Sequence, residues 1–138
     1  MNSHIINLFL EYDIIVLCES HFNVRITCPE GFVFSGRSKP VESKRPRGGV
    51  VVYTNKQLDA ELVILTDDLR DALIISIKDS NIIIAALYIP PINSQFYHDI
   101  YFDNLNLIMD RFQNSDIIIT GDLNARVDNM HDIYENIS

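Results

Sequence analysis

Four polar side chains that could bind a ligand follow apolar runs of the sequence. Glu19 comes after Asp-Ile-Ile-Val-Leu-Cys, Tyr88 lies near the end of Ile-Ile-Ile-Ala-Ala-Leu-Tyr-Ile, and Asp122 and Asn124 follow Ile-Ile-Ile-Thr-Gly. In open α/β sheets, ligands bind outside the carboxyl ends of the strands. Taken singly, each residue also fits a loop-capping acid or a tyrosine at the rim of a core. Together they predict one ligand-binding edge of a sheet.

The elements that position these side chains are predicted from hydrophobic periodicity and turn residues. Strands are predicted at residues 13–18, 32–34, 50–53, 62–65, 73–77, 82–89 and 116–120. The first and the last of these runs are typical of strands covered on both faces. Asp79-Ser80-Asn81 predicts a hairpin between two of the strands. Helices are predicted at 5–10 and at 94–113, the second with Ser94 as its N-cap. The pattern is that of one mixed α/β domain.

Composition and charge exclude several classes of protein. The chain has 138 residues, 47% of them hydrophobic, which fits one globular domain. The longest uncharged stretch, 80–98, contains two prolines, so we expect no membrane span and a soluble, intracellular protein. Cys18 and Cys28 have no histidines at zinc-binding distances and favour a reducing compartment. The net charge of −8 argues against broad electrostatic binding of nucleic acid.

The charge is nevertheless uneven, because a basic segment lies in the predicted polar loop at 35–47. Between Gly36 and Gly48 the one acidic residue is Glu42. The basic residues of this stretch are Arg37, Lys39, Lys44, Arg45 and Arg47. Such a run is either a solvated loop or a loop that touches phosphate, and its composition alone leaves both interpretations open. The following Gly48-Gly49 lacks the Gly-Lys-Ser/Thr of a phosphate loop and predicts a tight turn into a strand.

Four segments, in this order, carry a family resemblance: DIIVLCESHF, RGGVVVY, ALYIPP and IIITGDLNAR. They resemble the endonuclease/exonuclease/phosphatase superfamily, and within it they are most similar to the endonuclease domains of non-LTR retrotransposons. The resemblance runs from about residue 5 to about residue 127. It implies a partial two-sheet α/β sandwich, a mixed sheet with flanking helices. It also implies hydrolysis of DNA phosphodiesters, and a nuclear location for a retroelement-derived protein.

The resemblance implies a role for each of the four polar residues. Glu19 matches the family's metal-binding glutamate, and a carboxylate suits Mg²⁺, with Mn²⁺ as an alternative ion. Asp122 matches the aspartate that activates or orients the attacking water. Asn124 would point the same way along an extended segment and hold the phosphate or that aspartate. Tyr88 matches a tyrosine that approaches the phosphate. Lys44, Arg45 and Arg47 would be the contacts to nucleic acid.

Departures from the family pattern lead us to expect that residues 1–138 are an incomplete domain, inactive alone. The family's first strand with its asparagine, its late aspartate and its terminal Asp-His pair have no match. His131-Asp132 has the reverse order and lies too early, so His131 is rejected, and His21 fits a loop histidine better than a substrate contact. Two alternatives stay open: a phosphatase of the same superfamily, suggested by Arg126 after Gly-Asp-Leu-Asn, and a non-catalytic remnant or binding module. The sequence does not indicate an oligomeric state.

Overall fold

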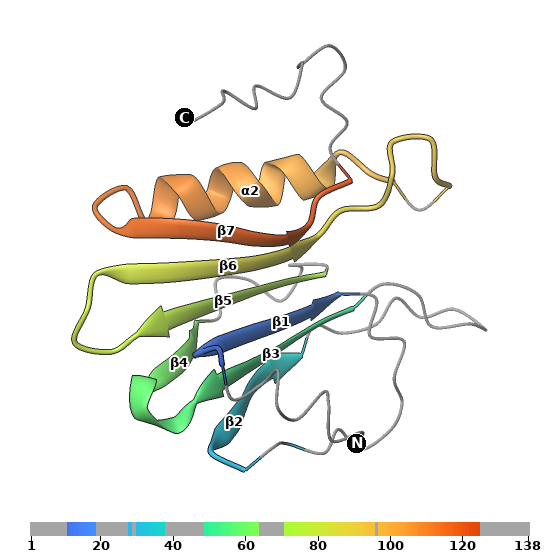
Figure 1. Ribbon diagram of the computed structural model, residues 1–138. Coiled ribbons are helices and arrows are strands. Elements are labelled where there is room, and N and C mark those ends of the chain that lie inside the picture. Colours follow the sequence, from blue (N-terminus) through green and yellow to red (C-terminus); the bar gives the residue numbers. More distant parts are fainter. Residues whose placement is uncertain are drawn as a thin grey trace, which may run out of the picture.

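The computed structural model of the protein is a mixed α/β fold with two sheets, as the sequence predicts (Figure 1). It describes residues 11–18, 28, 30–37, 49–63, 71–95 and 97–124, without the side chains of 34–37. The described elements are β1 (Ile14–Cys18), β2 (Phe32–Arg37), β3 (Val50–Asn55), the 3₁₀ turn η1 (Lys56–Leu58), β4 (Ala60–Val63), β5 (Ala72–Ile77), β6 (Ile82–Tyr88), α2 (Ile100–Arg111) and β7 (Asp116–Asp122). The predicted helix at 5–10 and the end of the predicted strand at 64–65 lie outside these residues.

The first sheet has three antiparallel strands in the order β1-β3-β2. Cys18 at the end of β1 pairs with Val50 at the start of β3, and Arg37 at the end of β2 pairs with Val51. The predicted loop at 35–47 is wrong at its beginning, because β2 continues to Arg37. The pairing with β3 shifts by one residue between Phe34 and Gly36. This irregularity is a β-bulge, which lets β2 contain one residue more than its partner and continue pairing as far as Arg37.

The second sheet has four strands in the order β4-β5-β6-β7. The predicted hairpin is confirmed: β5 and β6 are antiparallel, and Asp79 lies in the left-handed region of φ (58°) within their turn. Strands β6 and β7 are parallel, and α2 lies between them along the chain. A crossover of this kind is needed because parallel strands cannot be joined by a tight turn. It brings the carboxyl ends of β6 and β7 to the same edge.

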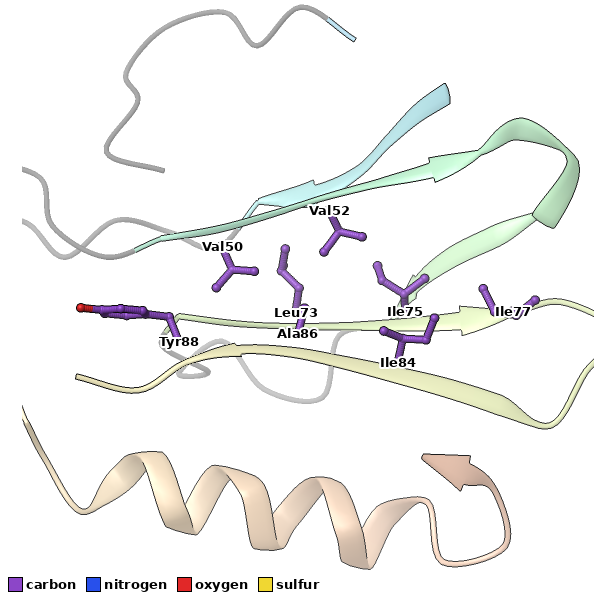
Figure 2. Packing of buried hydrophobic residues seen from close by; sticks show 8 residues of the cluster. All are labelled: Val50, Val52, Leu73, Ile75, Ile77, Ile84, Ala86 and Tyr88. Atoms are coloured by element: carbon purple, nitrogen blue, oxygen red, sulfur yellow. The ribbon is translucent and has the colours of Figure 1, made fainter. Parts of the chain in front are cut away.

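The two sheets pack against each other through one apolar cluster. Alternate residues of β3, β5 and β6 face one another across the gap (Figure 2). The buried members are Val50, Val52, Leu73, Ile75, Ile77, Ile84, Ala86 and Tyr88. The other face of the second sheet packs on α2 through a second cluster that includes Ile83, Ala85 and Ile108. Strand β6 is therefore covered on both faces, which accounts for its continuous apolar sequence.

The strands at the sheet margins are less buried than their sequences predict. Leu17 in β1 has 40% of its surface exposed, and Ile118 in β7 has 51%. Each strand has one neighbour among the described residues, β3 for β1 and β6 for β7. The prediction that both runs are covered on two faces is therefore wrong for the described part of the chain. Apolar sequence predicted the strands correctly but did not predict their place in the sheets.

The predicted long helix is shorter than expected. Helix α2 begins at Ile100, with Asp99 at the N-cap, and not near Ser94. Ser94 instead takes part in two successive turns: its N–H donates to the carbonyl of Pro91, and its carbonyl accepts from Tyr97. These turn hydrogen bonds use backbone groups that a helix beginning at Ser94 would need, so the helix begins later. No helix in the described ranges has both the length and the apolar composition to span a membrane.

We predict that the contact between the sheets dominates stability. Ile75 is fully buried in it, so Ile75→Ala should lower the free energy of unfolding by about 2–5 kcal/mol. Ile118→Ala is the matched control, because the same side chain is half exposed there and its loss should cost under about 1 kcal/mol. Urea unfolding followed by circular dichroism measures both. Equal losses for the two variants would contradict the prediction.

Candidate functional site at the carboxyl ends of β1, β6 and β7

The candidate site lies at the edge where β1, β6 and β7 end, which we call the site edge. In Figure 1 the arrowheads of these three strands point to the same side of the molecule. Tyr88 and Asp122 are direct partners in the parallel ladder, and the N–H of Ile89 donates to the Asp122 carbonyl at 2.8 Å. Tyr88 is buried, whereas the Asp122 side chain is exposed. Figure 2 shows the Tyr88 hydroxyl at the outer end of the apolar cluster.

Asn124 closes this edge by two hydrogen bonds. Its backbone N–H donates to Oδ1 of Asp122 at 3.0 Å, which forms an Asx turn. Its side-chain Nδ2 donates to the carbonyl of Ile89 at 2.8 Å. The expectation of an extended segment is wrong, because Asn124 has φ 44°, in the left-handed region that asparagine tolerates. The amide therefore fixes the end of β6 and does not point the same way as the carboxylate.

Gly121 allows β7 to approach β6 closely at this edge. Its φ is +122°, which side chains rarely adopt, and a Cβ there would overlap the carbonyl group of Leu87. The same Leu87 carbonyl accepts a weak hydrogen bond from Sγ of Cys18, at 3.7 Å. The end of β1 thus meets the ends of β6 and β7 at one backbone group. Glycine is needed before Asp122 for this packing reason.

Four of the predicted site residues, and His21, lie outside the described residues. Glu19 directly follows Cys18, but its own position lies outside the described residues, as do His21 and the predicted contacts Lys44, Arg45 and Arg47. The two ends of the basic segment are described. Arg37 and Gly49 flank it, and the pairing of Arg37 with Val51 and of Cys18 with Val50 brings both ends to the site edge.

Asp71 is a residue of this edge that sequence reasoning missed. Its side chain is 2% exposed, Oδ1 accepts from the N–H of Gly49 at 2.8 Å, and Oδ2 accepts from the hydroxyl of Tyr101 at 3.2 Å. Its backbone carbonyl accepts from the N–H of Tyr88 at 2.8 Å. Asp71 follows two other aspartates in a polar stretch, which reads as solvated surface. The signal that could have found it is an acid placed directly before an apolar strand.

The described carboxylates do not form a ready-made cation cage. No group of three His, Cys, Asp or Glu side chains gathers within the described ranges. At the site edge, Asp71 is enclosed by its donors, while Asp122 is exposed and has Oδ2 without a hydrogen-bond partner among the described residues. Comparison with known proteins adds nothing further: no family model matches the sequence, and no curated protein matches it.

We predict that a methyl group at Gly121 disrupts the site edge. Gly121→Ala would be strained by its φ and by overlap with Leu87, so it should destabilise the chain by clearly more than the ~1–2 kcal/mol of left-handed strain alone. Gly31→Ala is the matched control, because φ is +84° there but nothing lies within 4 Å of the added carbon. Denaturant unfolding gives the two losses, and amide shifts of Tyr88 and Asp122 report the local change. Equal destabilisation by the two variants would show that the close approach is unimportant.

Proposed function

We propose that this chain carries part of the active site of a Mg²⁺-dependent phosphodiesterase, most similar to a DNA endonuclease of a retroelement-derived reading frame. The proposed fold is that of the endonuclease/exonuclease/phosphatase superfamily, with two sheets stacked as an α/β sandwich. The observation that carries the proposal is the meeting of Tyr88, Asp122 and Asn124 at one edge, next to the end of β1. These three residues are far apart in sequence from Glu19, yet the residue before Glu19 touches the same edge.

Each described side chain at this edge has a property that suits phosphodiester hydrolysis. Asp122 is exposed and oriented through Oδ1, so its other oxygen can take a proton from an attacking water. The Tyr88 hydroxyl, at the rim of the core, can donate to a phosphoryl oxygen. Asn124 holds the carboxylate and the end of β6 in place. Preorganised groups of this kind need little rearrangement when charge develops on the phosphate.

Glu19 is the proposed ligand of the metal ion. It follows Cys18, whose Sγ contacts the Leu87 carbonyl beside Tyr88. When bound, Mg²⁺ would offset negative charge on the scissile phosphate and on the leaving oxygen. A single carboxylate holds this ion weakly, because Mg²⁺ gives up its waters reluctantly. For this reason we propose that residues 1–138 have little or no activity by themselves.

DNA is the proposed substrate because of where the basic segment is attached. Both of its described ends, Arg37 and Gly49, lie at the site edge, and Lys44, Arg45 and Arg47 stand between them in the sequence. Lysine and arginine near a phosphodiester site supply the sequence-independent part of nucleic-acid binding. This arrangement favours a polymeric substrate over a small phosphomonoester.

The metal site makes a prediction that does not require catalysis. Mn²⁺ added to the ¹⁵N-labelled chain should broaden the amide signals of Ile89, Leu123 and Asn124 first, and Glu19→Gln should raise the Mn²⁺ concentration needed several-fold. Glu61→Gln is the matched control, because Glu61 is exposed in β4. The turn at 78–81 serves as an internal reference at the opposite end of the sheets. Equal broadening at both ends, or no effect of Glu19→Gln, would rule out this metal site and favour a binding module.

The basic segment predicts how DNA binding responds to salt. Arg45→Ala combined with Arg47→Ala should weaken binding to every duplex tested and reduce the salt slope by about 2, roughly one unit per lost phosphate contact. The matched control combines Lys56→Ala with Lys78→Ala, which remove the same charge from exposed positions at the far end. Fluorescence anisotropy at several salt concentrations measures both. Unchanged affinity and slope would leave the segment as a solvated loop, and no binding by the parent chain would contradict DNA as the partner.

A further inference from the structure

Asp71 links both sheets and helix α2 through hydrogen bonds of its side chain. Its carboxylate accepts hydrogen bonds from Gly49, which directly precedes β3 of the first sheet, and from Tyr101 in α2. Asp71 itself directly precedes β5 of the second sheet. Both acceptor oxygens are thus used, and they connect both sheets and the helix at the site edge.

Burial of this carboxylate is not explained by a gain in the stability of the fold. A charged side chain at 2% exposure is costly unless its oxygens accept good hydrogen bonds, and an apolar residue would fill the same space without that cost. The hydrogen bonds to Gly49 and Tyr101 are directional, whereas apolar contacts are not. What the carboxylate adds is therefore fixed geometry between the elements that it joins.

The backbone of Asp71 carries this geometry to Tyr88. Asp71 has φ 47°, in the left-handed region that aspartate and asparagine tolerate better than most residues. In this conformation its carbonyl accepts from the N–H of Tyr88, one residue beyond the last ladder pair of β5 and β6, Ala72 with Leu87. The final residue of β6 is therefore held by the same aspartate that holds Gly49 and Tyr101.

We propose that Asp71 is a positioning residue of the active site, which fixes Tyr88 relative to Gly49 at the start of β3. This role rests on the proposed function, because it assumes that Tyr88 meets the phosphate. Asp71 does not touch substrate: it is enclosed, and both its oxygens accept from the protein. It acts through the backbone N–H of Tyr88 and through the N–H of Gly49.

The test compares Asp71→Ala, Asp71→Asn and Tyr101→Phe in the full chain by NMR, without metal or DNA. Asparagine keeps an acceptor for Gly49 and tolerates the left-handed backbone, and its amide can donate to the Tyr101 hydroxyl, so it is the conservative variant. Asp116→Ala is the matched control, since Asp116 is an exposed aspartate that begins β7 at the far end. The site-specific signature is the ring signal of Tyr88, assigned with Tyr88→Phe.

In Asp71→Ala we expect shifted signals for the Tyr88 ring and the Ile89 amide. Hydrogen exchange at the Gly49 amide should become about tenfold faster than in the parent, while exchange at the Lys78 amide serves as the reference that stays unchanged. Asp71→Asn should restore both, and Asp116→Ala should change neither. If Asp71→Ala does not fold, Tyr101→Phe, which removes one hydroxyl, should give the same local pattern with a smaller size.

Unchanged Tyr88 signals in the folded variants would overturn the positioning role, as would a uniform acceleration of exchange at all amides or a failure of Asp71→Asn to restore them. The Mn²⁺ experiment fails or succeeds independently of this result. Loss of the metal site with an intact effect at Tyr88 would count against the proposed function and not against the geometry at Asp71.

Discussion

Burial of apolar side chains between the two sheets is the interaction on which the other features of this protein depend. Valines of β3 meet isoleucines of β5 and β6, with Val52 and Ile75 both fully buried. This contact is non-directional, so by itself it would allow the sheets to slide. The directional hydrogen bonds at the site edge fix the position of one sheet relative to the other. They can form because the core already holds the strand ends close together.

The two aspartates at the site edge have opposite environments and suit opposite tasks. Asp71 is enclosed and gives its oxygens to protein donors, whereas Asp122 is exposed and keeps one oxygen without a partner among the described residues. A buried carboxylate whose two oxygens both accept hydrogen bonds fixes geometry, while the exposed carboxylate of Asp122 is open to solvent. The Leu87 carbonyl and Gly121 place Asp122 beside Tyr88 by allowing the backbones to approach closely.

Strand β7 carries the candidate site at its carboxyl end and is the last strand of its sheet among the described residues. Its carboxyl end carries Asp122, yet Ile118 and Ile119, on opposite faces, are both more than a third exposed. An edge strand with apolar side chains exposed is prone to pair with other chains. The parallel ladder with β6 runs along the whole strand, and at its end the Asp122 carbonyl accepts from the N–H of Ile89 while the Asp122 carboxylate accepts from the N–H of Asn124.

The sequence by itself determined the strands, the β5–β6 hairpin and the positions of the polar residues along the chain, because period, branching and turn residues act locally. It could not determine which strands lie at the sheet margins, so β1 and β7 were expected to be buried. It missed where α2 begins, because the turns after Pro91 compete with the helix. Only the tertiary structure decided that Asp71 is enclosed and that Asn124 turns back onto Ile89. Both depend on partners more than 20 positions away, which hydrophobic patterning does not encode.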